Sequence, residues 1–129
     1  SVFHNRLAKG MPLQTDPTVL YGMMLKQRRV VMNITRQDLS TKTPYNTYTF
    51  VGLPYGPISN PGFNSLKAAL NPAKTELLYF VSRNDGTSQF SKSLSEHSSA
   101  VRKYQMDAKA REGKSWRNLN KPTILKKEK

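Results

Sequence analysis

Residues 77–90 read LLYFVSRNDGTSQF, and they indicate the fold class more clearly than any other part of the chain. The run 77–81 is apolar and rich in residues that favour strands, and residues 88–90 suit a returning strand. Between the two runs stands Asn84-Asp85-Gly86, in which asparagine and glycine tolerate a positive φ. The stretch therefore predicts a β-hairpin.

Helical patterns lie on both sides of this hairpin. After it, Ser93 and Glu96 have the spacing of a capping box, ahead of a helix that we expect to continue to Ala108. Before it, residues 63–70 repeat apolar side chains at helical spacing and are followed by Asn71-Pro72, which ends a helix.

Two further helices are predicted nearer the start of the chain. Residues 2–7 are spaced like an amphipathic helix that stops near Gly10. Asp16 suits an N-cap, with Pro17 as the first residue of a short helix. Residues 26–40 fit a helix or a strand equally well.

Two neighbouring segments complete the coarse picture. Residues 45–51 are rich in strand formers and predict an extended, largely buried run. Residues 52–62 contain three prolines and three glycines, which predicts a loop. Because helices and strands mix without a βαβ repeat, we predict an α+β fold. It would be a small mixed sheet with a β-hairpin and flanking helices, in a single domain over residues 1–112 with a basic tail over 113–129.

The amino-acid composition excludes several classes of function. The chain has 21 Lys and Arg, 8 Asp and Glu, a net charge of +13 and no cysteine. Zero cysteines exclude disulfides and thiolate chemistry, and two histidines make a metal centre improbable, so we expect no metal and no cofactor. The apolar stretch near residues 19–25 is too short for a membrane span, and we expect a soluble chain.

The segment 43–66 contains no charged residue, although the chain is strongly charged. Aromatic rings with neutral amides and hydroxyls suit an uncharged ligand such as a sugar. The same rings also suit simple packing on the core. The candidate sugar contacts in this segment are Tyr45, Asn46, Tyr48, Tyr55 and Asn60.

Asp16 is the sole charge between Gly10 and Leu25. A carboxyl in apolar surroundings can have its pKa raised enough to donate a proton, which would make Asp16 a candidate acid. An N-cap role explains the same residue equally simply.

Several strings of residues resemble one known family, the YceG-like endolytic murein transglycosylases (MltG). The resemblance runs from Ser1 to about Tyr104. It is carried by the strings SVFHNRL (1–7), GMPLQTDPTV (10–19), PYNTY (44–48), GLP (52–54), GPI (56–58), NPG (60–62), ALNPA (69–73) and LYFV (78–81).

The resemblance implies cleavage of peptidoglycan between N-acetylmuramic acid and N-acetylglucosamine, which leaves a 1,6-anhydro end. One glutamic acid then serves as general acid and general base. In the family it lies on the helix just before the stretch matching residues 2–7, so we expect no catalytic residue within this chain. Gln14 and Asp16 would support that acid, and the five candidate contacts would line the glycan groove.

The resemblance also implies a location and partners. Family members carry an N-terminal membrane anchor, absent here, which places the catalytic domain on the outer face of the cytoplasmic membrane in the cell envelope. Peptidoglycan synthases are candidate partners. The chain starts at Ser1 without an initiator Met and within a helical pattern, so we expect a fragment of such an enzyme.

The chain departs from the family pattern at two positions. Ser88 stands where the family usually has histidine, which puts a polar role there in doubt. Tyr55 stands where a second proline is common, which would reshape the sugar groove.

Two alternatives belong to other classes. The charge of +13, with Lys26-Gln27-Arg28-Arg29 and the basic tail, is typical of a nucleic-acid-binding module. However, the rings gather where the charges are missing, whereas single-strand binders place both in one groove; we therefore expect no nucleic-acid partner. A non-catalytic cell-wall-binding fragment is the other alternative.

Overall fold

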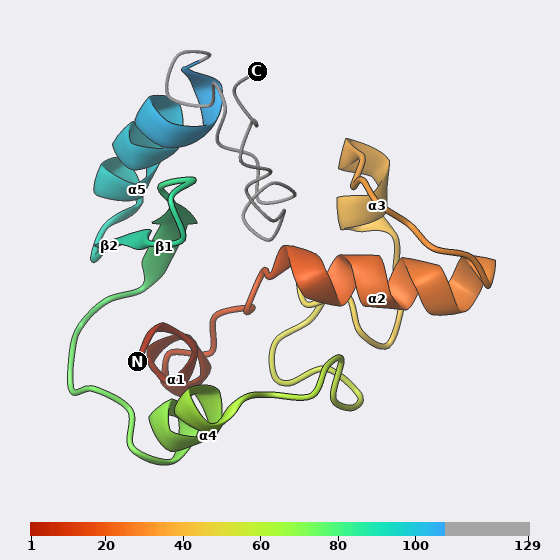
Figure 1. Ribbon diagram of the computed structural model, residues 1–129, viewed down its shortest axis with the longest axis horizontal. Helices are drawn as coiled ribbons and strands as arrows, with labels where there is room; N and C mark the ends of the chain where they lie inside the picture. Colours follow the sequence, from red (N-terminus) through yellow and green to blue (C-terminus); the bar gives the residue numbers. More distant parts are fainter. Residues whose placement is uncertain (108–129) are drawn as a thin grey trace, which may run out of the picture. The chain divides into compact units, whose positions relative to one another are not determined.

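The computed structural model describes residues 1–107. These residues group into two compact units, Ser1–Glu76 and a second that begins at Leu77 (Figure 1). The predicted tail 113–129 lies outside the described residues. The helix predicted to continue to Ala108 was too long, because it ends at Met106 and Asp107 is already extended. Helices together with a β-hairpin confirm the α+β class.

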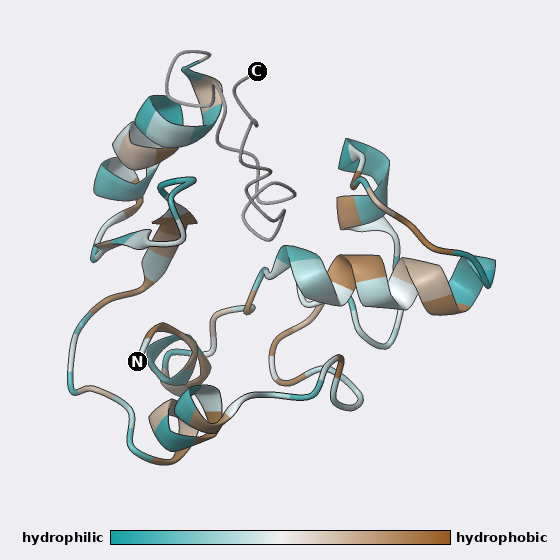
Figure 2. Ribbon diagram, viewed as in Figure 1, coloured by the Kyte–Doolittle hydropathy of each residue, from teal (hydrophilic) through white to brown (hydrophobic). Residues whose placement is uncertain are grey.

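The first unit opens with two helices. α1 spans Val2–Ala8, as predicted, and the chain then turns at Gly10 with a φ of 64°. α2 spans Asp16–Gln27, and its central turns carry brown, apolar bands separated by paler ones (Figure 2). Its N-cap is Thr15, so the predicted N-cap was one residue late and Asp16 is the first helical residue.

The ambiguous segment after α2 contains a short helix. α2 ends where Arg28 adopts a φ of 53°, and α3 then spans Arg36–Ser40. Thr35 and Asp38 form a capping box, in which the Thr35 hydroxyl accepts from Asp38 N and the carboxylate accepts from Thr35 N. This reciprocal cap fixes the start of a helix too short to persist through propensity alone.

Residues 45–51 form successive turns, so the predicted extended run was wrong. The physical reason is local competition by side chains for backbone groups. Asn46 N bonds to the Thr43 backbone and hydroxyl, Tyr48 N donates to Asn46 Oδ1, and the Thr49 hydroxyl donates to Asn46 O. Burial was predicted correctly for part of the run, because Asn46 and Thr47 have no exposed surface.

The turn segment packs closely against α2 at Gly22. A Cβ at this position would lie well inside van der Waals contact of the Thr43 hydroxyl. The same hydroxyl accepts from Asn46 N at 3.0 Å. Glycine in the middle of α2 therefore allows the turn to approach the helix.

The first unit ends with the predicted loop over residues 52–62 and then α4, which spans Phe63–Leu70 as predicted. Asn71 caps the end of α4, with its N–H donating to Lys67 O. The apolar residues Phe63 and Leu70 of this helix are exposed.

The second unit contains the hairpin. β1 spans Tyr79–Ser82 and β2 spans Ser88–Ser91, paired antiparallel with Tyr79 opposite Ser91 and Ser82 opposite Ser88. Asn84 and Gly86 adopt φ values of 64° and 88°, as the predicted turn requires.

A helical segment packs on this hairpin. α5 spans Leu94–Val101 and begins with the predicted capping box, in which the Ser93 hydroxyl accepts from Glu96 N. It continues directly into η1, a π-helical turn spanning Arg102–Met106. Within residues 1–107, no helix combines the length and the apolar character needed to cross a membrane.

Candidate functional site

Gln14 lies in the loop before α2 and is held from two sides. Its backbone has a φ of 51°, and its N–H donates to Thr47 O at 3.1 Å. Its side-chain Oε1 accepts from Arg6 Nη1 at 3.3 Å, and the same Nη1 donates to Pro12 O at 2.8 Å. Arg6 is buried in α1, so a fixed guanidinium orients the exposed Gln14 amide.

Asp16 and Tyr48 form the shortest side-chain pair in this region. Tyr48 Oη donates to Asp16 Oδ1 at 2.6 Å. Burial, followed by the bond to Asp16 and its negative charge, raises the pKa of Tyr48 well above its ordinary value, and Arg6 opposes this in part. Tyr48 therefore stays protonated and keeps orienting the carboxylate. Asp16 itself is exposed, so it lacks the apolar surroundings that a role as the acid would need.

Three threonine hydroxyls connect the start of α2 to the turn segment. Thr18 Oγ1 lies 2.8 Å from Thr47 Oγ1 and donates to Thr15 O at 2.6 Å. Thr15 N donates to Thr47 Oγ1 at 3.1 Å. This cluster was not predicted from the sequence; the signal for it is Thr15 and Thr18 spaced as an N-cap and a first-turn residue. The cluster holds Gln14, Asp16 and Tyr48 in one neighbourhood.

Asn46 lies inside the protein rather than on a binding surface. Its Nδ2 donates to the carbonyls of Asp38, Leu39 and Thr41 at 3.2, 3.1 and 2.8 Å, and its Oδ1 accepts from Tyr48 N. With no exposed surface, it cannot contact a glycan in this structure, so its predicted direct contact is corrected. Instead, it donates to carbonyls at and just after the end of α3, of which Asp38 O also accepts from Thr41 N at 3.1 Å.

The remaining predicted aromatic residues differ in exposure, from half-buried to almost fully exposed. Tyr45 is half-buried and packs edge-on against Tyr21 and Tyr55, with ring centroids 4.8 and 6.3 Å away. Tyr55 is 85% exposed, and its N–H donates to Pro44 O at 3.1 Å. The backbone of Tyr55 is thus fixed while its ring remains available to a ligand.

The structure does not gather every predicted residue in one place. Gln14, Asp16 and Tyr48 share one hydrogen-bonded neighbourhood, and Tyr45 and Tyr55 share another contact. Asn60 is exposed on the loop after Tyr55. One hollow of about 410 Å³ lies elsewhere in the first unit, between α1 and residues 72–76, and none of the predicted residues lines it.

Comparison with known proteins shows the family to which this chain belongs. Residues 1–103 match the YceG-like family, and the chain belongs to that family. This confirms the predicted resemblance. The matched residues include all seven of the predicted site residues.

Individual relatives agree with this assignment. The chain is 51% identical over 104 residues to an endolytic murein transglycosylase of Bacillus subtilis strain 168, covering 81% of this chain and 28% of that protein. It is 37% identical over 81 residues to an endolytic murein transglycosylase of Streptococcus pneumoniae D39, covering 62% of this chain and 15% of that protein.

A solved structure supports the fold. The crystal structure of a YceG-like protein from Listeria monocytogenes matches with a TM-score of 0.70 and 50% identity. The match covers 78% of this chain and 32% of that one. The chain thus spans less than a third of the length of each of these three relatives.

Proposed function

We propose that this chain is part of the catalytic domain of an endolytic murein transglycosylase and forms one wall of its glycan groove. The observation that carries the proposal is the match to the YceG-like family over residues 1–103, together with 51% identity to a relative of that name. The exposed polar and aromatic groups of the first unit are chemically suited to this role.

The proposed reaction needs one carboxyl, contributed by a glutamic acid that precedes residues 2–7 in the longer protein. This acid protonates the glycosidic oxygen, and the bond from that oxygen to C1 of the muramic residue breaks. The 6-hydroxyl of the same sugar attacks C1, and its proton passes to the glutamate. The product is a 1,6-anhydro ring, and the carboxyl is regenerated without water.

In this proposal, the residues at the start of α2 support the acid. Tyr48 fixes the Asp16 carboxylate through a 2.6 Å bond, and Arg6 fixes the Gln14 amide. An oriented carboxylate and amide next to a glutamic acid can hold its proton on the required oxygen. Asp16 and Gln14 would therefore act as positioning residues.

Tyr55 and Asn60 are the proposed direct contacts to the sugar. An exposed ring offers an apolar face to sugar C–H groups, and an exposed amide can donate to and accept from hydroxyls. Tyr45 would help to hold the Tyr55 ring through their edge-on contact. Asn46 would contribute only indirectly, by shaping the turn that holds Tyr45 and Tyr48.

We also propose a location and protein partners for the whole protein. A murein-cleaving enzyme acts in the cell envelope, and we propose that a segment outside this chain anchors it in the cytoplasmic membrane, with the catalytic domain on the outer face. Peptidoglycan synthases are the proposed protein partners, because strand cleavage must be matched to strand synthesis.

Glycan binding by residues 1–129 tests the proposed groove separately from catalysis. Murein glycan oligomers freed of peptide are titrated into the chain, and backbone amide resonances are recorded by NMR. We expect shifts near Tyr55 and Asn60, and Tyr55→Ala should weaken binding about tenfold because the ring loses its stacked sugar face.

Phe63→Ala provides a matched control. Phe63 is also an exposed ring, 78% accessible, but it lies on α4 outside the proposed contacts. Its removal should leave glycan affinity unchanged. Equal losses for the two variants, or no shift near Tyr55, would contradict the proposed groove.

A further inference from the structure

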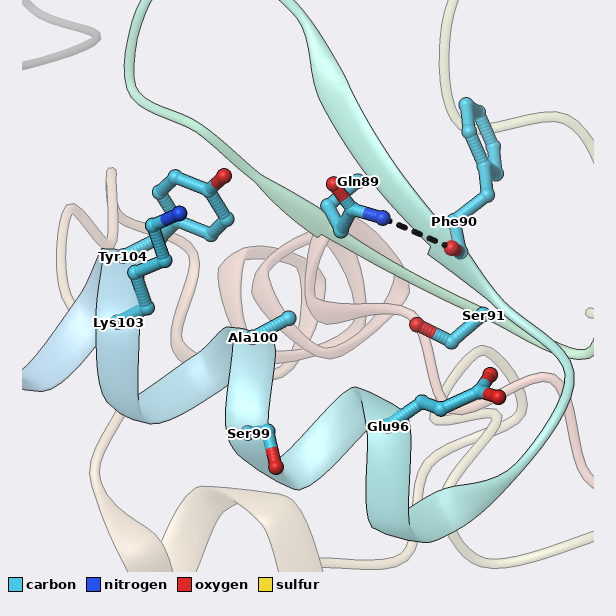
Figure 3. A pocket seen from close by; sticks show the side chains of 8 residues that line it. All are labelled: Gln89, Phe90, Ser91, Glu96, Ser99, Ala100, Lys103 and Tyr104. Atoms are coloured by element: carbon cyan, nitrogen blue, oxygen red, sulfur yellow. Dashed lines mark hydrogen bonds between the residues drawn. The ribbon is translucent and has the colours of Figure 1, made fainter.

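The second unit contains a hollow of about 280 Å³ between β2 and the α5–η1 segment, which we call the β2–α5 hollow (Figure 3). Its floor includes two small buried residues, Ser91 on β2 and Ala100 on α5. The volume is at the small end of ligand sites, enough for a few small residues of a peptide. None of the predicted glycan contacts lines it.

Opposite charges mark the two ends of the β2–α5 hollow. Figure 3 shows the Glu96 carboxylate at one end and the Lys103 ammonium at the other, with Ala100 between them. They are seven residues apart along the continuous α5–η1 segment, a rise of about 10 Å along its axis.

Each charge is held in place by its own surroundings. Glu96 Oε2 accepts from Lys92 N at 3.0 Å and Ser93 N at 3.4 Å, which leaves Oε1 to accept from a ligand. Lys103 Nζ lies 5.2 Å from the centroid of the Tyr104 ring, a cation–π distance. Lys103 and Tyr104 also belong to the π-helical turn η1, and such turns occur frequently at functional sites.

We propose that the β2–α5 hollow binds the peptide stem of the murein strand, with Glu96 taking the free ammonium of its diamino acid and Lys103 taking a carboxylate. An extended peptide advances about 3.3 Å per residue, so a span of about 10 Å corresponds to three residues. The stem offers ammonium and carboxylate groups on this scale, whereas the glycan has no ammonium, and its lactyl carboxyl is an amide wherever the stem is attached. This inference rests on the proposed function for the identity of the polymer.

A thermodynamic cycle tests the assignment of Glu96. The probe is N-acetyl-L-alanyl-γ-D-glutamyl-L-lysine, and the matched probe carries an acetyl group on the lysine side chain. Affinity for residues 1–129 is measured by NMR titration, with Kd expected near about 1 mM because exposed ion pairs are weak. Glu96→Gln keeps the capping box, since glutamine also serves at that position.

We expect Glu96→Gln to weaken binding of the first probe about fivefold. Acetylating the probe should cost the wild-type chain the same factor, and it should cost Glu96→Gln nothing further, because both changes remove one interaction. Independent, multiplying losses would overturn the assignment, as would no binding of the first probe.

Lys103→Gln should also weaken binding about fivefold, whereas Arg102→Gln should not. Arg102 is the exposed neighbour with the same charge, and it does not line the hollow. Equal losses would show attraction by net charge and overturn the proposal. Peptide-free glycan and glycan-free peptide are titrated separately, so failure of one site is distinguished from failure of the other.

Discussion

Asn46→Ala is the perturbation with the most clearly defined structural consequence. The wild-type side chain is fully buried and serves four backbone groups, namely three carbonyls over residues 38–41 and Tyr48 N. The Asn46 amide has two hydrogens, which are shared among the three carbonyls, and one oxygen, which accepts from Tyr48 N. About three effective hydrogen bonds therefore depend on this side chain. Alanine can replace none of them.

The expected loss follows from these groups. A buried donor or acceptor left without a partner costs about 1–3 kcal/mol, and relaxation or entering water recovers part of that. We expect Asn46→Ala to lower the free energy of unfolding by about 3–5 kcal/mol. This is a large fraction of the 5–15 kcal/mol that is typical of a domain.

Urea unfolding of residues 1–129, followed by far-ultraviolet circular dichroism, measures this loss. Asn60→Ala is the control; it removes an exposed amide and should change stability by no more than about 0.5 kcal/mol. Asn46→Asp keeps the oxygen that accepts from Tyr48 N, but it replaces the donating NH₂ group with an oxygen that faces the carbonyl oxygens. It should therefore lower stability at least as much as Asn46→Ala. A loss below about 1 kcal/mol for Asn46→Ala would refute this reasoning.

Three other predictions concern stability. Gly22→Ala would force its Cβ onto the Thr43 hydroxyl, and should cost about 1–3 kcal/mol in urea unfolding although alanine favours helices; a stabilised variant would contradict the close approach. The raised pKa of Tyr48 means that its stabilisation is complete below about pH 10 and is lost as the pH rises further; Tyr48→Phe should remove this alkaline loss, and an unchanged alkaline profile would count against the bond from Tyr48 to Asp16. Backbone and side-chain hydrogen bonds from Thr35 lower the pKa of Asp38, so its stabilisation is complete above about pH 4 and is lost as the pH falls; Asp38→Asn should flatten the acid limb of stability, and identical acid slopes would contradict it.

Local signals with a single physical meaning were predictable from the sequence. The hairpin depends on Asn84 and Gly86 taking positive φ, and few other residues do so at low cost. The capping box of Ser93 and Glu96 likewise fixes the start of α5. The family resemblance was also predictable, since it rests on strings of adjacent residues that need no knowledge of the fold.

Side-chain bonds between distant segments were not predictable. The pattern of residues 45–51 favours a strand, but the bonds that Asn46 makes to carbonyls over residues 38–41 stabilise turns instead. Tyr48 bonds to Asp16 although the two residues are 32 positions apart in the sequence, and no periodic pattern predicts such a contact. For the same reason, Asn46 was assigned to a binding surface although it lies in the interior.

The release of 1,6-anhydro muropeptides, measured by mass spectrometry, tests the central claim most directly. Purified murein is incubated with residues 1–129, and in parallel with the protein extended upstream through the preceding helix. We expect anhydro products from the extended protein, their loss when the glutamic acid of that helix is replaced by glutamine, and none from residues 1–129. Turnover by residues 1–129 alone would contradict the central claim.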